Sequence, residues 1–325
     1  MTGGSSSGSA AAVAAGFVPI ALGSDAGGSV RIPAALCGVM GLKATFGRVP
    51  AVGGSPLCYT LDHIGPMASS VWGLAATLQI IAGPDPRDRA SRAQPGLAPF
   101  DPRTVTSLRG RRVGWCPKWL EGADGGVQAV FHEALDGLRL GGAEISEVTI
   151  PHLEQVQPVG IVTLGAEAAT SQQRWLKANR SKYQPDTRML LALGESITAV
   201  EYLHAQRVRQ LICESFEAAL VSCDVLVSPT AGCVAPPIPP GALGSGMVDH
   251  ALNKMLSHFS FAGNLTGFPC LTLPVPVERG EMPVGLQLMS KPWSERHLLD
   301  IAAAVARVFP DPFASPGYVD IGNGS

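Results

Sequence analysis

Short apolar runs alternate with longer stretches of helical character along most of the chain. Two of the apolar runs, at residues 18–22 and 224–230, have the length and the turn-rich borders of buried strands. Further strands are predicted at residues 112–116, 143–150, 270–277 and 284–290. Helical patterns lie at residues 10–16, 70–81, 127–140, 153–178, 186–222, 253–265 and 295–309. Repeated strand-helix alternation predicts an α/β fold, with a mixed β-sheet core and helices on both faces.

Two of the predicted helices follow a serine that can cap the first turn. Ser69 or Ser70 precedes a helix through Ile81 whose apolar residues recur every three or four positions, and Ser294 precedes the last helix. The strand at 112–116, the helix at 127–140 and the strand at 143–150 predict a β-α-β unit. Residues 83–108 are rich in Pro, Asp and Arg, which indicates a long surface loop.

The composition is that of an ordinary α/β enzyme. With 325 residues, of which 46% are hydrophobic and 15% charged, the chain can bury a large core. Candidate motifs run from residue 3 to residue 293, which favours a single domain over residues 1–325. The net charge of −2, without a basic stripe, disfavours direct binding of nucleic acid.

The sequence gives no sign of a metal site or of a membrane span. The seven cysteines are scattered without paired or metal-ligand spacing, which indicates reduced thiols in a reducing compartment. The seven histidines are equally dispersed, so the sequence predicts neither a metal site nor a cofactor. No stretch reaches the ~20 apolar residues of a membrane span, and the alanine-rich start lacks the basic region of a signal peptide. We therefore expect a cytoplasmic protein or one bound peripherally to a membrane.

Two Gly-rich loops near the start of the chain carry the candidate chemistry. The first, GGSSSGS at residues 3–9, contains Ser5, and the second, GSDAGGSVR at residues 23–31, contains Ser29. Gly27 and Gly28 let the backbone curl so that consecutive N–H groups can converge on one point just before Ser29. Such a nest of N–H groups can stabilise an oxyanion, which makes Ser29 a candidate nucleophile.

These two loops resemble those of the amidase signature family, whose members hydrolyse amides with two serines and a lysine. The interval of 24 residues between Ser5 and Ser29 is the one that the family uses. Further family-like blocks lie at residues 32–50, 61–70, 227–243, 261–277 and 282–293, so the resemblance covers most of the chain. Within the family, the first loop, the PPIPPGAL segment and the AGNLTGFP segment look most like the plant-type fatty acid amide hydrolases.

The resemblance implies a role for each serine of the loops. Ser29 is expected to be the nucleophile, and Ser5 the bridging serine that relays its proton. Ser5 is expected to follow a cis peptide bond from Gly4, and Ser6 to add a hydrogen bond to the bridging group. The family mechanism therefore needs both loops to meet in space.

The resemblance also implies the surroundings of the nucleophile. The oxyanion is expected to be held by the backbone N–H groups of Ala26, Gly27, Gly28 and Ser29. Arg31 corresponds to the arginine that ties the nucleophile loop down, and Asp25 is expected to support the same loop.

The base of the family is a lysine upstream of the first loop, where this chain has only Met1 to Gly4. A serine hydroxyl needs a base that is neutral at working pH, and Ser5 can relay a proton only if another group accepts it. All six lysines lie downstream of Ser5, and the GLKATFG context of Lys43 has a structural counterpart in the family. The resemblance thus implies an amidase domain that is incomplete at its N-terminus, with Lys43 as the alternative base.

Three functions stay open at this point. The first is amide hydrolysis through an acyl-enzyme at Ser29, with a small-molecule amide, above all a fatty acid amide, as the substrate. The second is the glutaminase subunit of a tRNA-dependent amidotransferase, and the third is a non-catalytic fragment, because the upstream lysine is absent. A homodimer and a peripheral membrane contact are further expectations that accompany the lipid-amide interpretation.

Other interpretations of the same residues compete with the resemblance. Residues 4–8 match G-x-S-x-G, which would make Ser6 the nucleophile of an α/β-hydrolase, but four residues cannot supply the strand before that elbow. A Gly/Ser cluster also suits a flexible linker, and the second loop could cradle a phosphate although it lacks the Walker lysine. His63 could act as a general base, but we favour a packed, hydrogen-bonded role for it.

Overall fold

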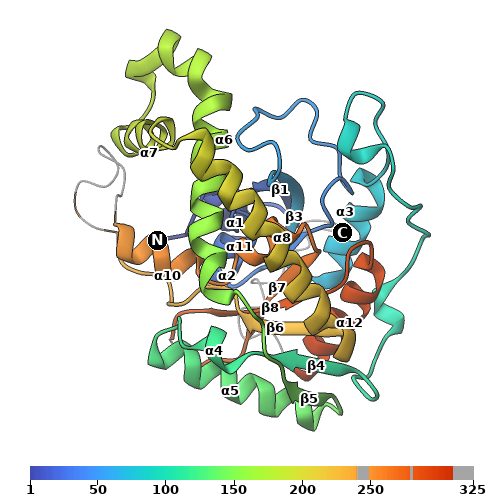
Figure 1. Cartoon of the computed structure of the whole chain (residues 1–325). Helices are drawn as coiled ribbons and strands as arrows, with labels where there is room; N and C mark the ends of the chain where they lie inside the picture. Colours follow the sequence, from blue (N-terminus) through green and yellow to red (C-terminus); the bar gives the residue numbers. More distant parts are fainter. Residues whose placement is uncertain (239, 241–248, 279–280, 310–325) are drawn as a thin grey trace, which may run out of the picture.

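Among the residues that the structure describes, eight strands from distant parts of the sequence form one mixed sheet (Figure 1). The computed structural model describes residues 1–238, 240, 249–278 and 281–309. The strands lie in the order β1-β3-β2-β7-β8-β6-β4-β5. Their bounds are β1 (Ile20–Asp25), β2 (Met40–Lys43), β3 (His63–Ala68), β4 (Arg112–Trp115), β5 (Glu144–Glu147), β6 (Val225–Pro229), β7 (Cys270–Val275) and β8 (Val284–Met289).

The sheet is parallel at one end and antiparallel elsewhere. Strand β4 runs parallel to β5 and β6, and the other neighbouring strands are antiparallel. Helix α5 (Gly125–Leu140) connects β4 to β5, and its buried residues Val127, Phe131, Leu135 and Leu138 recur at helical spacing. This arrangement confirms the predicted β-α-β unit.

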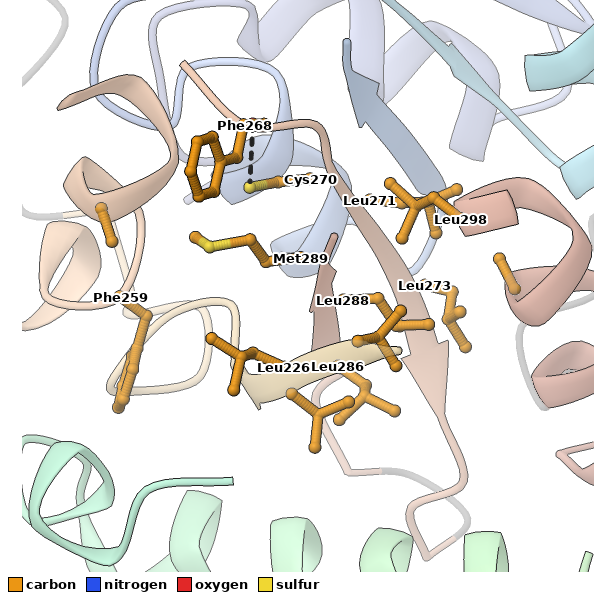
Figure 2. Packing of buried hydrophobic residues seen from close by; sticks show 14 of the residues in the cluster. Leu226, Phe259, Phe268, Cys270, Leu271, Leu273, Leu286, Leu288, Met289 and Leu298 are labelled. Atoms are coloured by element: carbon orange, nitrogen blue, oxygen red, sulfur yellow. Dashed lines mark hydrogen bonds between the residues drawn. The ribbon is translucent and has the colours of Figure 1, made fainter. Parts of the chain in front are cut away.

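Helices cover both faces of the sheet, as the strand-helix alternation predicts. Successive residues of a strand point to opposite faces. Leu271 of β7 lies beside Leu298 of α12 (Figure 2), whereas Cys270 lies against Gly263 of α11. The remaining helices are α1 (Ser7–Ala14), α2 (Arg31–Leu36), α3 (Val71–Ile81), α4 (Pro117–Leu120), α6 (Val156–Asn179), α7 (Pro185–Glu195), α8 (Ala199–Ser222) and α10 (His250–Ser257), with α11 at Phe261–Thr266 and α12 at Glu295–Val308.

The layers are held together by a continuous apolar core. Helix α12 contacts α3 and α5 over one face, and α2 contacts α1 and the central strands over the other. Figure 2 shows leucines of β6, β7 and β8 meeting at the centre of the sheet, where Leu226, Leu286 and Leu288 are buried. None of the described helices is long and apolar enough to cross a lipid bilayer.

The first strand differs from the prediction in place and in burial. The sequence predicts a buried strand at residues 18–22, but β1 spans Ile20–Asp25 and lies at the end of the described sheet. The strand begins after Pro19, which has no N–H to donate, and Leu22 is 48% exposed. The prediction of a buried strand is therefore wrong, because an apolar run carries no information about which strands flank it.

Two predicted long helices are each interrupted. The pattern at 253–265 belongs to α10 and α11, which are separated around the fully buried Phe259. The pattern at 186–222 belongs to α7 and α8, because Thr198 and Glu201 form a capping box that starts a new helix. Apolar periodicity continues through both breaks, so it does not reveal them.

The predicted caps have different outcomes. Ser70 caps α3, since its side chain accepts a hydrogen bond from the N–H of Gly73. Ser294 precedes α12, but its hydroxyl donates to Lys291 O and accepts no bond from the first turn. The segment 83–108 contains two single 3-10 turns, at Arg89–Ser91 and Pro102–Thr104. Residues 239 and 241–243 of the Pro-rich block lie outside the described residues.

Candidate active site

The two Gly-rich loops meet at the start of α1 and the end of β1. The N–H of Ser6 donates to the carbonyl of Ser29 at 3.2 Å, so the loops are joined one residue from Ser5. The Gly4–Ser5 peptide bond is cis, as the resemblance implies. In the part of the chain that the structure describes, no hydrogen bond joins the hydroxyls of Ser5 and Ser29 directly.

Ser6 has a different partner from the one expected. Its hydroxyl donates to the carbonyl of Ser24 and accepts from the N–H of Ser24, both at 3.2 Å. It therefore fastens the first loop to β1, and the expected hydrogen bond to the bridging Ser5 is not formed.

A buried carboxylate organises the loop that carries Ser29. Asp25 accepts hydrogen bonds from the backbone N–H groups of Gly28, Val30 and Arg31, at 2.8, 3.1 and 3.4 Å. It also accepts from Nε and Nη2 of Arg31, at 3.0 and 2.9 Å, and from Nδ2 of Asn264 at 2.9 Å. Three backbone donors and three side-chain donors thus converge on one side chain that has no exposed surface.

Asp25 and Arg31 are both charged within the protein. Burial by itself would raise the pKa of Asp25, but the charge and hydrogen bonds of Arg31 outweigh it and hold this pKa well below its usual range. Burial would likewise lower the pKa of Arg31, and the attraction of Asp25 raises it instead. A buried ion pair is tolerated when its remaining polar atoms are hydrogen-bonded, which is the case here. The prediction that Arg31 ties the loop down agrees with these contacts.

The loop leaves only part of the expected oxyanion nest free. Gly28 has a φ of +116°, a conformation that favours glycine, and its N–H is committed to Asp25. Gly28 is therefore not a free donor in this arrangement, contrary to the expected set. Within the described residues, the N–H groups of Ala26, Gly27 and Ser29 have no acceptor, so these three remain candidates to bind an oxyanion.

Three buried polar residues near the Asp25–Arg31 pair are not identified by the sequence motifs. Asn264 Oδ1 accepts from Arg31 Nη2 at 2.7 Å, and Gln287 Oε1 accepts from Arg31 Nη1 at 2.6 Å. Ser260 accepts another bond from Arg31 through its carbonyl, at 3.0 Å. The signal in the sequence is a polar amide side chain inside a mostly apolar block, as Asn264 is in FAGNLTGFP and Gln287 in VGLQLMS.

Lys43 is fully buried beside His63. Its ammonium donates to the carbonyls of Ala44 and Phe268, and it lies 3.2 Å from Nε2 of His63. Burial lowers the pKa of Lys43 to about 8, and the nearby charge of Arg31 also lowers it. Among the described residues Lys43 has no hydrogen bond to Ser5 or Ser29, so its contacts support a structural role.

His63 is also part of the structural interior. Its Nδ1 lies 2.6 Å from the carbonyl of Leu61, which can only accept, so Nδ1 carries the proton and Nε2 accepts from Lys43. Burial and the charge of Lys43 hold the pKa of His63 well below its ordinary value. The neutral, packed role predicted for His63 agrees with these contacts.

A groove of about 720 Å³ lies between α6, α7 and α8, away from the serine loops. Its lining includes Tyr59, Glu167 and Tyr202, but neither Ser5 nor Ser29. The buried carboxylate of Glu167 accepts from the hydroxyls of Thr60 and Tyr202, at 2.8 and 2.7 Å. Glu167 thereby links α6 and α8 to the segment that enters β3.

The sequence matches a protein-family model over most of its length. That model describes amidases and matches residues 1–299. The chain belongs to the amidase signature family. Its mixed sheet with helices on both faces is the fold expected for such an amidase, and the serine loops lie within the matched residues.

The chain is similar to two kinds of curated protein. It is 36% identical to the fatty acid amide hydrolase of Oryza sativa subsp. indica over 310 residues, which are 94% of this chain and 51% of that protein. It is 37% identical to a glutamyl-tRNA(Gln) amidotransferase subunit of Chloroflexus aggregans over 331 residues, which are 94% of this chain and 66% of that protein. The chain thus spans about half the length of the fatty acid amide hydrolases that it matches.

A solved structure shows the same fold. The corresponding glutamyl-tRNA(Gln) amidotransferase subunit of Thermotoga maritima has a TM-score of 0.79 and 30% sequence identity, and the match covers 95% of this amidase and 66% of that chain.

Proposed function

We propose that this amidase supplies the nucleophile and the oxyanion nest of an amide hydrolase. The observation that carries the proposal is the set of six hydrogen bonds to Asp25, which fixes the backbone around Gly28 and leaves the N–H groups of Gly27 and Ser29 without an acceptor among the described residues. Preorganised N–H donors next to a serine hydroxyl are what acyl transfer needs.

In the proposed reaction, Ser29 Oγ attacks the amide carbonyl and the oxyanion is held by the free N–H groups of the loop. Ser5 takes the proton of Ser29 as it passes its own proton to a base, and the same relay then returns a proton to the departing nitrogen, so that ammonia or an amine leaves and an acyl-enzyme forms. Water then gives one proton to the relay and attacks the ester. The relay returns this proton to Ser29 as the carboxylic acid leaves.

The relay needs a final proton acceptor. No lysine of the described residues hydrogen-bonds Ser5, and Lys43 is committed to backbone carbonyls. We therefore propose that the base is a lysine other than those among the described residues. It would lie on a further segment of the same polypeptide or on a second polypeptide. The family resemblance places such a lysine upstream of the first loop.

The proposed substrate is a fatty acid amide. This choice follows the similarity to fatty acid amide hydrolases of several plants at 36–38% identity. A glutaminase is the second candidate, because the amidotransferase subunits match at 37% identity and over a larger share of their own length. The two candidates differ in the substrate they bind and not in the chemistry at Ser29.

Substrate assays test this proposal. The chain would be assayed alone and after fusion, before Thr2, of the upstream segment of the rice relative, with a long-chain fatty acid amide and with glutamine. We expect the fused protein to hydrolyse the fatty amide, with Ser29→Ala inactive and the matched control Ser7→Ala active. Glutamine hydrolysis without fatty amide hydrolysis would favour the second candidate, and inactivity of a folded fused protein toward both would contradict the proposal.

A peripheral membrane contact accompanies the lipid-amide proposal. The C-terminal end of α6 and helix α7 project beyond the sheet (Figure 1) and expose apolar side chains, including Trp175 of α6 at 57% and Leu190 of α7 at 52%. The same stretch carries five basic residues: Arg174, Lys177, Arg180, Lys182 and Arg188. Basic and apolar side chains together favour an anionic lipid surface. Co-sedimentation with phosphatidylserine vesicles, lost in Trp175→Glu and kept in the control Ile80→Glu, is the expected result.

A further inference from the structure

Ser260 lies directly behind the loop that carries Ser29. It occupies the break between α10 and α11, and it has no exposed surface. Its hydroxyl is 2.5 Å from the carbonyl of Gly27 and 3.1 Å from the carbonyl of Ser257. Because the hydroxyl has one proton and the Gly27 carbonyl is closer, Gly27 is its main acceptor.

The Gly27–Gly28 peptide unit is therefore held at both ends. Its carbonyl accepts from Ser260, and its N–H donates to Asp25 at 2.8 Å. A peptide unit is planar, so two hydrogen bonds in opposite directions fix its orientation. Glycine backbones otherwise have wide conformational freedom, which makes such a restraint necessary here.

The hydrogen bonds of this peptide unit to Ser260 and Asp25 belong to one connected network of contacts. The carbonyl of Ser260 accepts from Arg31 at 3.0 Å, and Arg31 pairs with Asp25, which in turn holds Gly28. Ser260 also packs closely against Gly28, because a Cβ added to Gly28 would lie 2.5 Å from the Ser260 side chain. A Cβ on Gly27 would lie 2.8 Å from the ring of Phe261. The start of α11 thus contacts both glycines.

We propose that Ser260 is a positioning residue that sets the oxyanion nest. The Gly27–Gly28 unit lies between the two peptide units that carry the free N–H groups of Gly27 and Ser29. When Ser260 and Asp25 fix the middle unit, the dihedral angles on both sides of it are restrained, and the flanking donors are held before any substrate binds. The inference rests on the proposed function, because the nest matters only if Ser29 reacts.

The restraint can be measured without activity. In protein labelled with ¹⁵N-glycine, the amide of Gly28 is expected to exchange slowly with solvent because Asp25 holds it. Ser260→Ala is expected to accelerate this exchange by about 5- to 10-fold, the effect of one ordinary hydrogen bond, and Ser260→Cys to give an intermediate rate. Ser257→Ala is the matched control, since the hydroxyl of Ser257 donates to the carbonyl of Asn253 on the same segment. Unchanged exchange in a folded Ser260→Ala protein would overturn the proposal.

A second readout separates positioning from simple support of the fold. In the fused protein, the rate at which a fluorophosphonate labels Ser29 is expected to fall by about 10-fold in Ser260→Ala, less than the 10²–10³ of losing an oxyanion donor outright. In the amide-hydrolysing fused protein the loss is expected in kcat, with KM unchanged. Faster exchange at Gly28 with an unchanged labelling rate would overturn the positioning role. A wild type that is not labelled contradicts the proposed function instead, and the exchange experiment still decides whether Ser260 restrains Gly28.

Discussion

Replacement of Gly28 by alanine tests whether this glycine is required by space as well as by conformation. Gly28 has a φ of +116°, and a Cβ built there would lie 2.5 Å from the Cβ and Oγ of Ser260 and 2.6 Å from Cδ1 of Ile32. Gly53 is the matched control. It has a φ of +97° but lies in an exposed loop, where an added Cβ meets nothing within 4 Å.

Both variants place alanine at a positive φ, but only Gly28→Ala also overpacks a buried site. A non-glycine residue at such a φ costs of order 1–3 kcal/mol, and this applies to Gly53→Ala and Gly28→Ala alike. Overpacking of a buried site adds roughly 1–3 kcal/mol, because the neighbours must shift. We therefore expect Gly28→Ala to lose about 4 kcal/mol of unfolding free energy and Gly53→Ala about 2 kcal/mol.

Urea denaturation of the chain, followed by tryptophan fluorescence, measures both losses. In the fused protein, fluorophosphonate labelling of Ser29 is expected to slow strongly in Gly28→Ala, because Ser260 and the loop cannot both keep their places, and to stay unchanged in Gly53→Ala. An equal loss of unfolding free energy in the two variants would refute this prediction, since it would mean that Ser260 and Ile32 do not fill the space next to Gly28.

The remaining predictions concern the charged interior and the proton relay. Arg31→Met is expected to cost about 3–5 kcal/mol of unfolding free energy because it leaves Asp25 buried and unpaired, whereas Arg87→Met, at an exposed ion pair, is expected to have little effect in the same urea titration. The pKa of Lys43 is about 8 in the folded protein and near 10.4 in the unfolded chain, so between these pH values the folded protein binds fewer protons. The unfolding free energy of the wild type should therefore rise over this pH range by about 3 kcal/mol relative to that of Lys43→Met. A difference between the two proteins that does not change with pH would contradict the lowered pKa. Ser5→Ala in the fused protein is expected to lower kcat by about 10²–10⁴ with a smaller change in KM, and an unchanged kcat would remove Ser5 from the mechanism.

Much of the fold can be predicted because its signals are local. The strands near 112–116, 224–230 and 284–290 are short apolar runs between turn residues, and the structure has β4, β6 and β8 there. The two serine loops can be located from their glycine and serine content together with the 24-residue interval between Ser5 and Ser29. The position of β1 at the edge of the described sheet cannot be predicted from the apolar run at residues 18–22, because it depends on which strands pair with one another.

The candidate site can be predicted where its residues are neighbours in the sequence. Asp25 and Arg31 lie within seven residues, and the resemblance implies that both support the nucleophile loop, where the structure pairs them. The contacts of Asn264 and Ser260 with this loop span 239 and 233 residues, so only the folded chain brings them together. The hydrogen bond from the Gly28 N–H to Asp25 spans three residues, but the sequence motif does not show which acceptor this N–H takes.

Mapping the residue that a fluorophosphonate modifies tests the central claim most directly. The fused protein would be labelled, digested and examined by peptide mass spectrometry, with Ser29→Ala as the control. The account predicts a single adduct on Ser29, lost in Ser29→Ala. An adduct on Ser6, or amide hydrolysis that persists in Ser29→Ala, would contradict the assignment of Ser29 as the nucleophile.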